Sequence, residues 1–211
     1  EFAVPILRAV FESKHKILGV YTKPPKKKNR GQKIDYTPVY NFSVKNNIKV
    51  KFPEKLDTEE ELKFISENKP NVIIVVAYGK IIPPKLLNIK DIKFINVHAS
   101  LLPKWRGAAP IQRSIMNLDS ETGISIMKLA PKLDTGPILI NSKVKILKET
   151  TYEDLSYQLS KLGAKLTLDS LNLIENGKDV FIDQNENEAT YAKKISKIET
   201  KIDWEDKAER I

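Results

Sequence analysis

The sequence contains no cysteine and only two histidines, His15 and His98. Without cysteine the chain cannot form disulfides, thiolate nucleophiles, iron–sulfur clusters or thiolate zinc sites. Two histidines are also too few for a metal site built from several imidazoles, so we predict no metal ion. Chemistry in this chain must therefore proceed without a thiolate and without a metal site built from several histidines.

Long apolar runs and several enzyme motifs are also missing. No window approaches the ~20 consecutive apolar residues of a membrane span, and the start lacks the basic region and apolar core of a signal peptide. We therefore expect a soluble, cytoplasmic protein with no membrane partner. The motifs G-x-G-x-x-G, G-x-x-x-x-G-K-[ST], G-x-S-x-G and H-E-x-x-H do not occur, which disfavours dinucleotide-binding, nucleoside-triphosphate-binding and serine hydrolase functions.

Apolar residues make up 41% of the 211 positions, enough for a sizeable core. Helical and strand patterns alternate along the chain, and the apolar strand "NVIIVVAY" indicates burial on both faces, as in a parallel sheet covered by helices. We therefore expect an α/β fold. The predicted helices cover 2–11, 38–46, 58–68, 108–117 and 151–176, and the predicted strands cover 17–22, 48–52, 71–78, 92–98, 123–129 and 138–146.

The last predicted helix carries the strongest local signals. Thr150 and Glu153 fit a capping box at its start, and Gly177 is placed to end it. A leucine stripe with helical spacing indicates a buried face rather than a cofactor site; its members are Leu155, Leu159, Leu162 and Leu166.

Two polar residues, Asn96 and His98, stand at the carboxyl end of the strand in "FINVHASLLPKWRGAAP". Open α/β sheets bind ligands at this edge, and residues i and i+2 of a strand point to the same side. An amide and a protonated imidazole suit a developing oxyanion. A histidine hydrogen-bonded in the core is the alternative. Asp134 in "LDTGPIL" either orients the imidazole or forms an Asx turn before Gly136.

The segment between these groups predicts an irregular loop that leads into a helix and walls a pocket. Pro103 and Pro110 fix the backbone there, and Gly107 permits conformations that other residues avoid. Trp105 and Arg106 either face this pocket or pack together on the surface. In "VVAYGKIIPP", only the polar turn around Tyr78 and Gly79 is expected to face a ligand.

The net charge of +9 is distributed unevenly. The segment "KPPKKKNRGQK" at 23–33 carries six cations and no acid, and its two prolines and one glycine predict a loop without helix or strand pairing. Such a segment either binds a polyanion or is simply solvated.

Four segments together resemble the folate-dependent formyltransferase family: "VVAYGKIIP", "INVHASLLPKWRGAAPIQ", "ETGISIMKLAPKLDTGPIL" and "YAKKISKIETKIDW". The resemblance extends almost from end to end. It implies a Rossmann-like formyltransferase fold with a mainly parallel sheet flanked by helices, and 10-formyltetrahydrofolate as the formyl donor. Residues 1–188 would form the catalytic domain without its usual first strand. Residues 189–211 would form a linker and the start of a second, OB-like β-barrel domain that is mostly absent.

The resemblance also implies roles for individual residues. Asn96, His98 and Asp134 match the family's catalytic residues. The folate pocket would be lined by Ala77, Tyr78, Gly79, Ile81, Ser100, Leu101, Leu102 and Pro103.

Within the family, "KWRGAAPIQ" and the "IDW" tail resemble members that formylate methionine on initiator tRNA. We therefore expect formyl transfer to the α-amine of that methionine for translation initiation, by a monomer. The alternatives are formyl transfer to glycinamide ribonucleotide or an amino sugar, formyltetrahydrofolate hydrolysis, and non-catalytic RNA binding. The tRNA contacts would be Lys26, Lys27, Lys28, Arg30, Gly31, Lys33 and Arg106.

Overall fold

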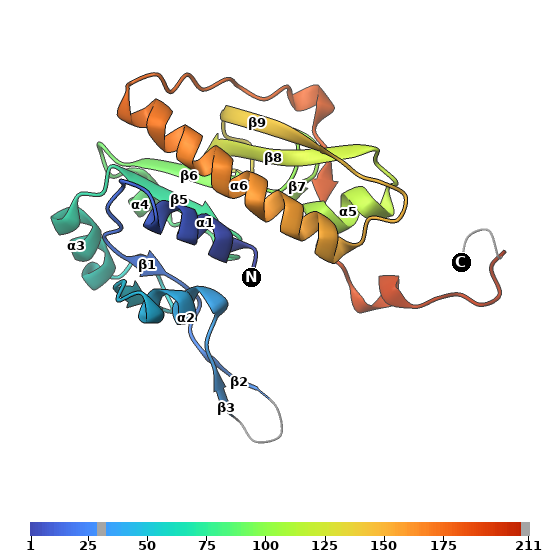
Figure 1. Ribbon diagram of the computed structural model, residues 1–211, viewed down its shortest axis with the longest axis horizontal. Coiled ribbons are helices and arrows are strands. Elements are labelled where there is room, and N and C mark those ends of the chain that lie inside the picture. The colour runs from blue at the N-terminus through green and yellow to red at the C-terminus, as the bar shows by residue number, and fades with distance from the viewer. Residues whose placement is uncertain (29–32, 208–211) are drawn as a thin grey trace.

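A four-stranded sheet forms the centre of the molecule (Figure 1). The computed structural model describes residues 1–28 and 33–207. The sheet has the order β5-β6-β8-β9, in which β5 and β6 are parallel and the other two pairs are antiparallel. Helices cover this sheet, which confirms the α/β class. The strands span Val72–Val76 (β5), Lys93–His98 (β6), Glu121–Lys128 (β8) and Ile138–Lys145 (β9).

Helices α1 (Ala3–Phe11) and α6 (Tyr152–Glu175) pack side by side over one face of this sheet (Figure 1). Burial of a large aliphatic side chain there contributes roughly 1.5–3 kcal/mol. Gly163 lets the layers approach, because a Cβ on it would lie 3.2 Å from both Ile6 and Val97. The buried cluster includes Ile6, Ile95, Val97, Ile124, Ile126, Leu155, Leu159 and Leu166.

A smaller parallel pair, β1 (Val20–Tyr21) with β4 (Val50–Lys51), lies beside α2 (Pro38–Lys45) and α3 (Glu59–Asn68). Both strands are shorter than predicted, because each pairs with no described strand but the other. Phe94 of β6 faces a second apolar cluster with Leu56, Ile65 and Leu86. The last of these lies in α4 (Pro84–Leu87). Strand β6 therefore lies between two apolar cores.

The start of α6 differs from the prediction by one residue. Thr151 and Asp154 form the capping box, with the Thr151 hydroxyl accepting from the Asp154 N–H at 3.2 Å. Thr150 is engaged elsewhere, because its hydroxyl accepts from the Leu147 N–H at 2.9 Å. The helix ends at Glu175 with Asn176 as its C-cap, and Gly177 follows with φ +64°, in the terminating position predicted for it.

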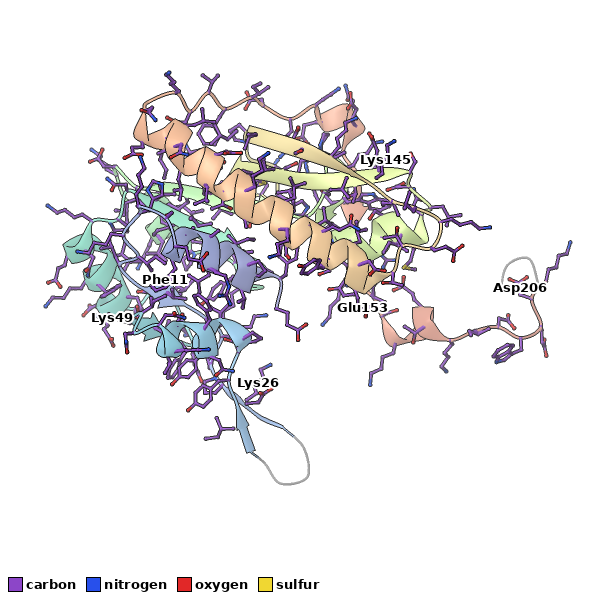
Figure 2. All side chains as sticks on the ribbon, viewed as in Figure 1. Phe11, Lys26, Lys49, Lys145, Glu153 and Asp206 are labelled. Atoms are coloured by element: carbon purple, nitrogen blue, oxygen red, sulfur yellow. The ribbon has the colours of Figure 1, made fainter. Side chains whose placement is uncertain are left out.

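The prediction that the basic segment forms no strand pairing is wrong. β2 (Lys26–Lys28) pairs antiparallel with β3 (Lys33–Asp35), and the two prolines precede β2 rather than interrupting the ladder. Figure 1 shows this hairpin projecting away from the sheet and its helices, and Figure 2 shows Lys26 near its base. Arg30 and Gly31 lie outside the described residues.

The chain after α6 returns to the loop that follows β6. β10 (Tyr191–Ala192) pairs in parallel with β7 (Arg106–Gly107), which leads into α5 (Pro110–Met116). Two 3₁₀ turns, Glu186–Glu188 and Lys197–Thr200, lie on either side of β10. In the described part of the chain no helix is long and apolar enough to cross a membrane.

Candidate active site

The carboxyl ends of β5 and β6 lie next to each other at one edge of the sheet. Val76 is in register with Val97, so the turn that follows β5 leaves the sheet beside His98. Ala77 and Gly79 in this turn have φ of +44° and +67°. The predicted ligand-facing turn and the predicted polar pair are therefore neighbours.

His98 is 5% exposed and both of its ring nitrogens face hydrogen-bonding groups. Nε2 lies 2.8 Å from the main-chain oxygen of Trp105, and since a carbonyl only accepts, Nε2 carries a hydrogen. Nδ1 lies 3.6 Å from Oδ2 of Asp134. In the imidazolium form His98 therefore donates at Nε2 and faces a carboxylate at Nδ1.

Asp134 joins the site through an uncommon backbone conformation. Its φ is +51°, in the left-handed region, and the residue is 8% exposed. Oδ2 accepts from the Gly107 N–H at 2.9 Å, and Oδ1 accepts from Nδ2 of Asn96 at 3.4 Å. The three predicted catalytic side chains therefore converge, from β6 and from the turn between β8 and β9.

The loop after β6 is fixed by Ser125, a residue that the motifs did not indicate. Its hydroxyl donates to the Ser100 carbonyl at 2.8 Å and accepts from the Leu102 N–H at 3.1 Å. Ser125 lies opposite His98 in the sheet register. In the sequence, Ser125 is distinguished only as the single hydroxyl residue in the apolar strand "GISIMKL". The peptide bond between Leu102 and Pro103 is cis.

The predicted folate-lining residues differ in their exposure to solvent. Ala77, Gly79 and Ile81 are exposed, the last by 88%. Ser100 is fully buried and donates its hydroxyl to the Lys104 carbonyl at 2.6 Å. Leu102 is buried as well, whereas Leu101 and Pro103 are half-buried.

Tyr78 is half-buried, and its hydroxyl has no hydrogen-bond partner among the described residues. Burial, and then the nearby carboxylate of Glu61, raise the pKa of Tyr78. The neutral phenol is therefore the favoured form, and its hydroxyl is buried where Tyr78 packs against the second apolar cluster.

Arg106 does not reach solvent, which contradicts the predicted tRNA contact by this side chain. It is 0% exposed. Its guanidinium makes two bonds to Glu186 at 2.7 and 2.9 Å and two to Oε1 of Gln184 at 2.9 and 3.1 Å. The bond to Glu186 raises the pKa of Arg106 and lowers the pKa of Glu186. Sequence patterns missed Gln184 and Glu186, which lie in a polar stretch typical of a domain edge.

A groove of about 690 Å³ opens next to Trp105, on the side of the site formed by α5 and β10. Tyr191 is 57% exposed there, and Lys193 and Lys194 are exposed beside it. The Trp105 indole donates to Asp119 at 2.7 Å. The groove combines cations with an accessible aromatic ring and adjoins the residue that contacts His98.

One wall of the groove depends on an ion pair between Arg113 and Glu199, 2.6 Å apart. The bond from Arg113 lowers the pKa of Glu199 from 4.5 to about 2. A carboxylate with a depressed folded-state pKa stabilises the fold above its unfolded pKa, and this contribution disappears as the pH falls through the folded value.

We expect Glu199→Gln to lower the melting temperature near neutral pH, with a difference from wild type that shrinks below about pH 4.5. Thermal melts across pH test this, and a constant difference would contradict it.

Comparison with known proteins agrees with this geometry. A profile of the formyl transferase family matches residues 1–171. The methionyl-tRNA formyltransferase of Pelagibacter ubique is 48% identical over 211 residues, which is 100% of this chain and 68% of that protein. The chain belongs to the methionyl-tRNA formyltransferase family. The chain spans 68% of the length of that protein.

Solved structures agree with membership of a formyltransferase family at the level of the fold. A phosphoribosylglycinamide formyltransferase from Anaplasma phagocytophilum superposes with a TM-score of 0.70 at 21% identity, covering 90% of this chain and 92% of its own. The formyltransferase PseJ from Anoxybacillus kamchatkensis, solved with a sugar nucleotide and tetrahydrofolate, has a TM-score of 0.59 at 25% identity, covering 82% and 84%. The Rossmann-like formyltransferase fold is therefore confirmed.

Proposed function

We propose that this protein transfers the formyl group of 10-formyltetrahydrofolate to the α-amine of methionine on initiator tRNA. The identity of 48% along the whole chain supports the reaction. The convergence of Asn96, His98 and Asp134 at one sheet edge is the single observation that supports a catalytic centre. The folate is a substrate here, and it supplies the formyl group.

The three side chains fit direct transfer, without a covalent bond to the protein. The neutral amine adds to the formyl carbon, and the formyl oxygen then gains negative charge. The Asn96 amide and the Nδ1–H of the His98 imidazolium are the donors that stabilise this oxygen; Nδ1 is available because it lies 3.6 Å from Asp134, beyond hydrogen-bond range, and one such donor is typically worth about 3 kcal/mol. Asp134 orients the imidazole. As the tetrahedral adduct collapses, His98 gives a proton to the departing folate nitrogen and takes up the proton that the attacking amine nitrogen loses, so the imidazole ends in the form in which it began.

The residues around this centre fit a flat, partly apolar donor. The turn of Ala77, Tyr78, Gly79 and Ile81 borders the trio on one side, and the loop 100–103 borders it on the other. The exposed Ile81 offers apolar surface beside the exposed Ala77 and Gly79. We assign the pteridine ring to this pocket.

We assign the acceptor end of the tRNA to the groove beside Trp105 and its phosphates to the basic hairpin. Tyr191 presents an exposed ring on which a base can stack. Lys26 on the hairpin is exposed. Residues 189–211 then serve as a linker toward a second domain, after a catalytic domain over 1–188.

The hairpin lysines should contribute salt-dependent affinity rather than base recognition. We expect the triple variant Lys26→Gln, Lys27→Gln and Lys28→Gln to bind initiator tRNA more weakly and with a salt slope lower by about 2 to 3 units. Filter binding across salt concentrations measures this. The matched control replaces Lys161, Lys165 and Lys178, which lie on or just after α6. An unchanged slope in the hairpin variant would support a merely solvated hairpin.

The proposed function is tested by incubating the full-length protein with 10-formyltetrahydrofolate and charged initiator tRNA, then measuring formylmethionine. Glycinamide ribonucleotide and an amino-sugar nucleotide serve as control acceptors. With 10-formyltetrahydrofolate present, we expect a formylated product from the charged tRNA and from neither control acceptor. Formate release without an acceptor would indicate a hydrolase, and tRNA binding without any product would indicate a non-catalytic protein.

A further inference from the structure

Gln184 lies between the two segments that contact His98. One segment carries Trp105 and Gly107, and the other carries Asp134 and Gly136. The Gln184 amide nitrogen donates to the carbonyls of Asp134 and Gly136 at 2.9 and 2.7 Å. Its amide oxygen accepts from the Arg106 side chain at 2.9 and 3.1 Å. One side chain therefore ties both segments together.

The orientation of this amide follows from its partners. Arg106 can only donate and the two carbonyls can only accept, so the oxygen must face the guanidinium and the nitrogen must face the turn. All amide hydrogen-bonding groups of Gln184 are used in this way. Arg106 is held in turn by its paired bonds to Glu186, which fix the plane of the guanidinium.

A closed ring of contacts results. Gly107, directly after Arg106, donates its N–H to the Asp134 carboxylate at 2.9 Å. The Asp134 carbonyl is bound through Gln184 to the Arg106 side chain. The carboxylate and the main-chain carbonyl of Asp134 are thus both held against the same short strand, β7. These contacts maintain Asp134 at its left-handed φ of +51°, a conformation that costs energy.

His98 depends on this ring for both of its partners. Nε2 faces the carbonyl of Trp105, which precedes Arg106, and Nδ1 faces the Asp134 carboxylate. The spacing between these partners decides whether the imidazole can meet both. A misplacement of about 1 Å at a reacting group can cost about a hundredfold in rate.

We propose that Gln184 is a positioning residue for formyl transfer, which sets the spacing between the Trp105 carbonyl and the Asp134 carboxylate and so holds the His98 imidazole. This role rests on the proposed function, but it concerns the contacts that position His98 and not the identity of the formyl acceptor. Gln184 itself contacts no reacting atom and acts through Asp134 and Arg106.

The sharpest variant is Gln184→Glu in the full-length protein. A glutamate keeps an oxygen toward Arg106 but turns a second oxygen toward the carbonyls of Asp134 and Gly136, so the bonds to the turn are lost and a negative charge is added there; the uncharged Gln184→Met variant below removes the bonds without that charge. Glu186→Gln is the matched control, because it changes the other partner of Arg106 and leaves the turn untouched. Gln184→Met is a second variant of similar shape that removes both sets of bonds.

We expect Gln184→Glu and Gln184→Met to lower kcat about tenfold to a hundredfold, with KM for charged tRNA within about twofold of wild type. Glu186→Gln should stay within about threefold in kcat. In ¹⁵N NMR at fixed pH, the ring nitrogens of His98, assigned by their loss in His98→Gln, should shift in Gln184→Glu and not in Glu186→Gln.

Normal kcat in either Gln184 variant, with unshifted His98 nitrogens, would overturn the proposal. Equal losses in the Gln184 and Glu186 variants, in step with their melting temperatures, would overturn it as well, because that pattern indicates a structural role. If Gln184→Glu does not fold, Gln184→Met is judged by the same criteria. A wild-type protein without formyl transfer would contradict the proposed function instead, and the NMR comparison would still decide the role of Gln184.

Discussion

His98→Ala should lower turnover about a hundredfold or more, with tRNA affinity unchanged. The imidazole is 5% exposed and lies between Trp105 and Asp134, so under the proposed mechanism its removal takes away a donor for the formyl oxygen and not a tRNA contact. Asn96→Ala should act in the same direction. Single-turnover assays with saturating donor measure the effect.

His15→Ala is the matched control for this experiment. His15 is the other histidine of the chain and lies just after α1, far along the sequence from the β6 end. It should keep wild-type turnover. Near-normal turnover in His98→Ala would remove His98 from the catalytic group, while a parallel loss of tRNA binding would indicate a damaged fold.

Gly136→Ala should both destabilise the fold and nearly abolish activity. A Cβ at this position would lie 1.8 Å from the Lys128 carbonyl oxygen and 2.9 Å from its carbon, so the turn has to move. Overpacking of this kind costs about 1–3 kcal/mol or more. The movement also displaces Asp134, two residues earlier, and should lower kcat about a hundredfold. Thermal melts and kinetics below the lowered melting temperature measure the two effects.

Gly177→Ala is the control for Gly136→Ala, because it introduces backbone strain without a steric clash. Nothing lies within 4 Å of a Cβ at Gly177, and the residue has φ +64° at the end of α6. An alanine there should cost about 1 kcal/mol of stability and leave kcat unchanged. If Gly136→Ala behaves in the same way, the turn does not hold Asp134 for catalysis.

Local patterns were sufficient to predict most of the elements. The apolar run at 71–78 predicted β5, and the leucine stripe predicted α6, because each element buries a continuous face and its side-chain periodicity is visible in the chain. Asn96 and His98 were recognisable because they interrupt a buried strand at its carboxyl end. The capping box was misplaced by one residue, since two adjacent threonines satisfy the same pattern and only the Thr150 contact to Leu147 separates them.

The clamp around Asp134 could not be derived from local patterns. Arg106 and Gln184 are 78 residues apart, and nothing in a polar segment indicates which distant guanidinium it satisfies. An arginine in a loop is expected to be exposed to solvent or to contact a phosphate. Arg106 is buried instead, because the Glu186 carboxylate balances its charge and the Gln184 amide oxygen accepts further hydrogen bonds from it. The pairing in the basic hairpin was missed for a related reason, since the prolines lie one step outside the ladder.

The alternation of side chains along β6 has an evolutionary consequence. Ile95 and Val97 enter the core under α1 and α6, while Asn96 and His98 point to the opposite face. Inserting or deleting one residue before Asn96 would send the two polar groups into the apolar interior and bring the aliphatic ones to the proposed catalytic site. Chain-length variation among descendants of this protein should therefore accumulate in the projecting hairpin and be purged from β6.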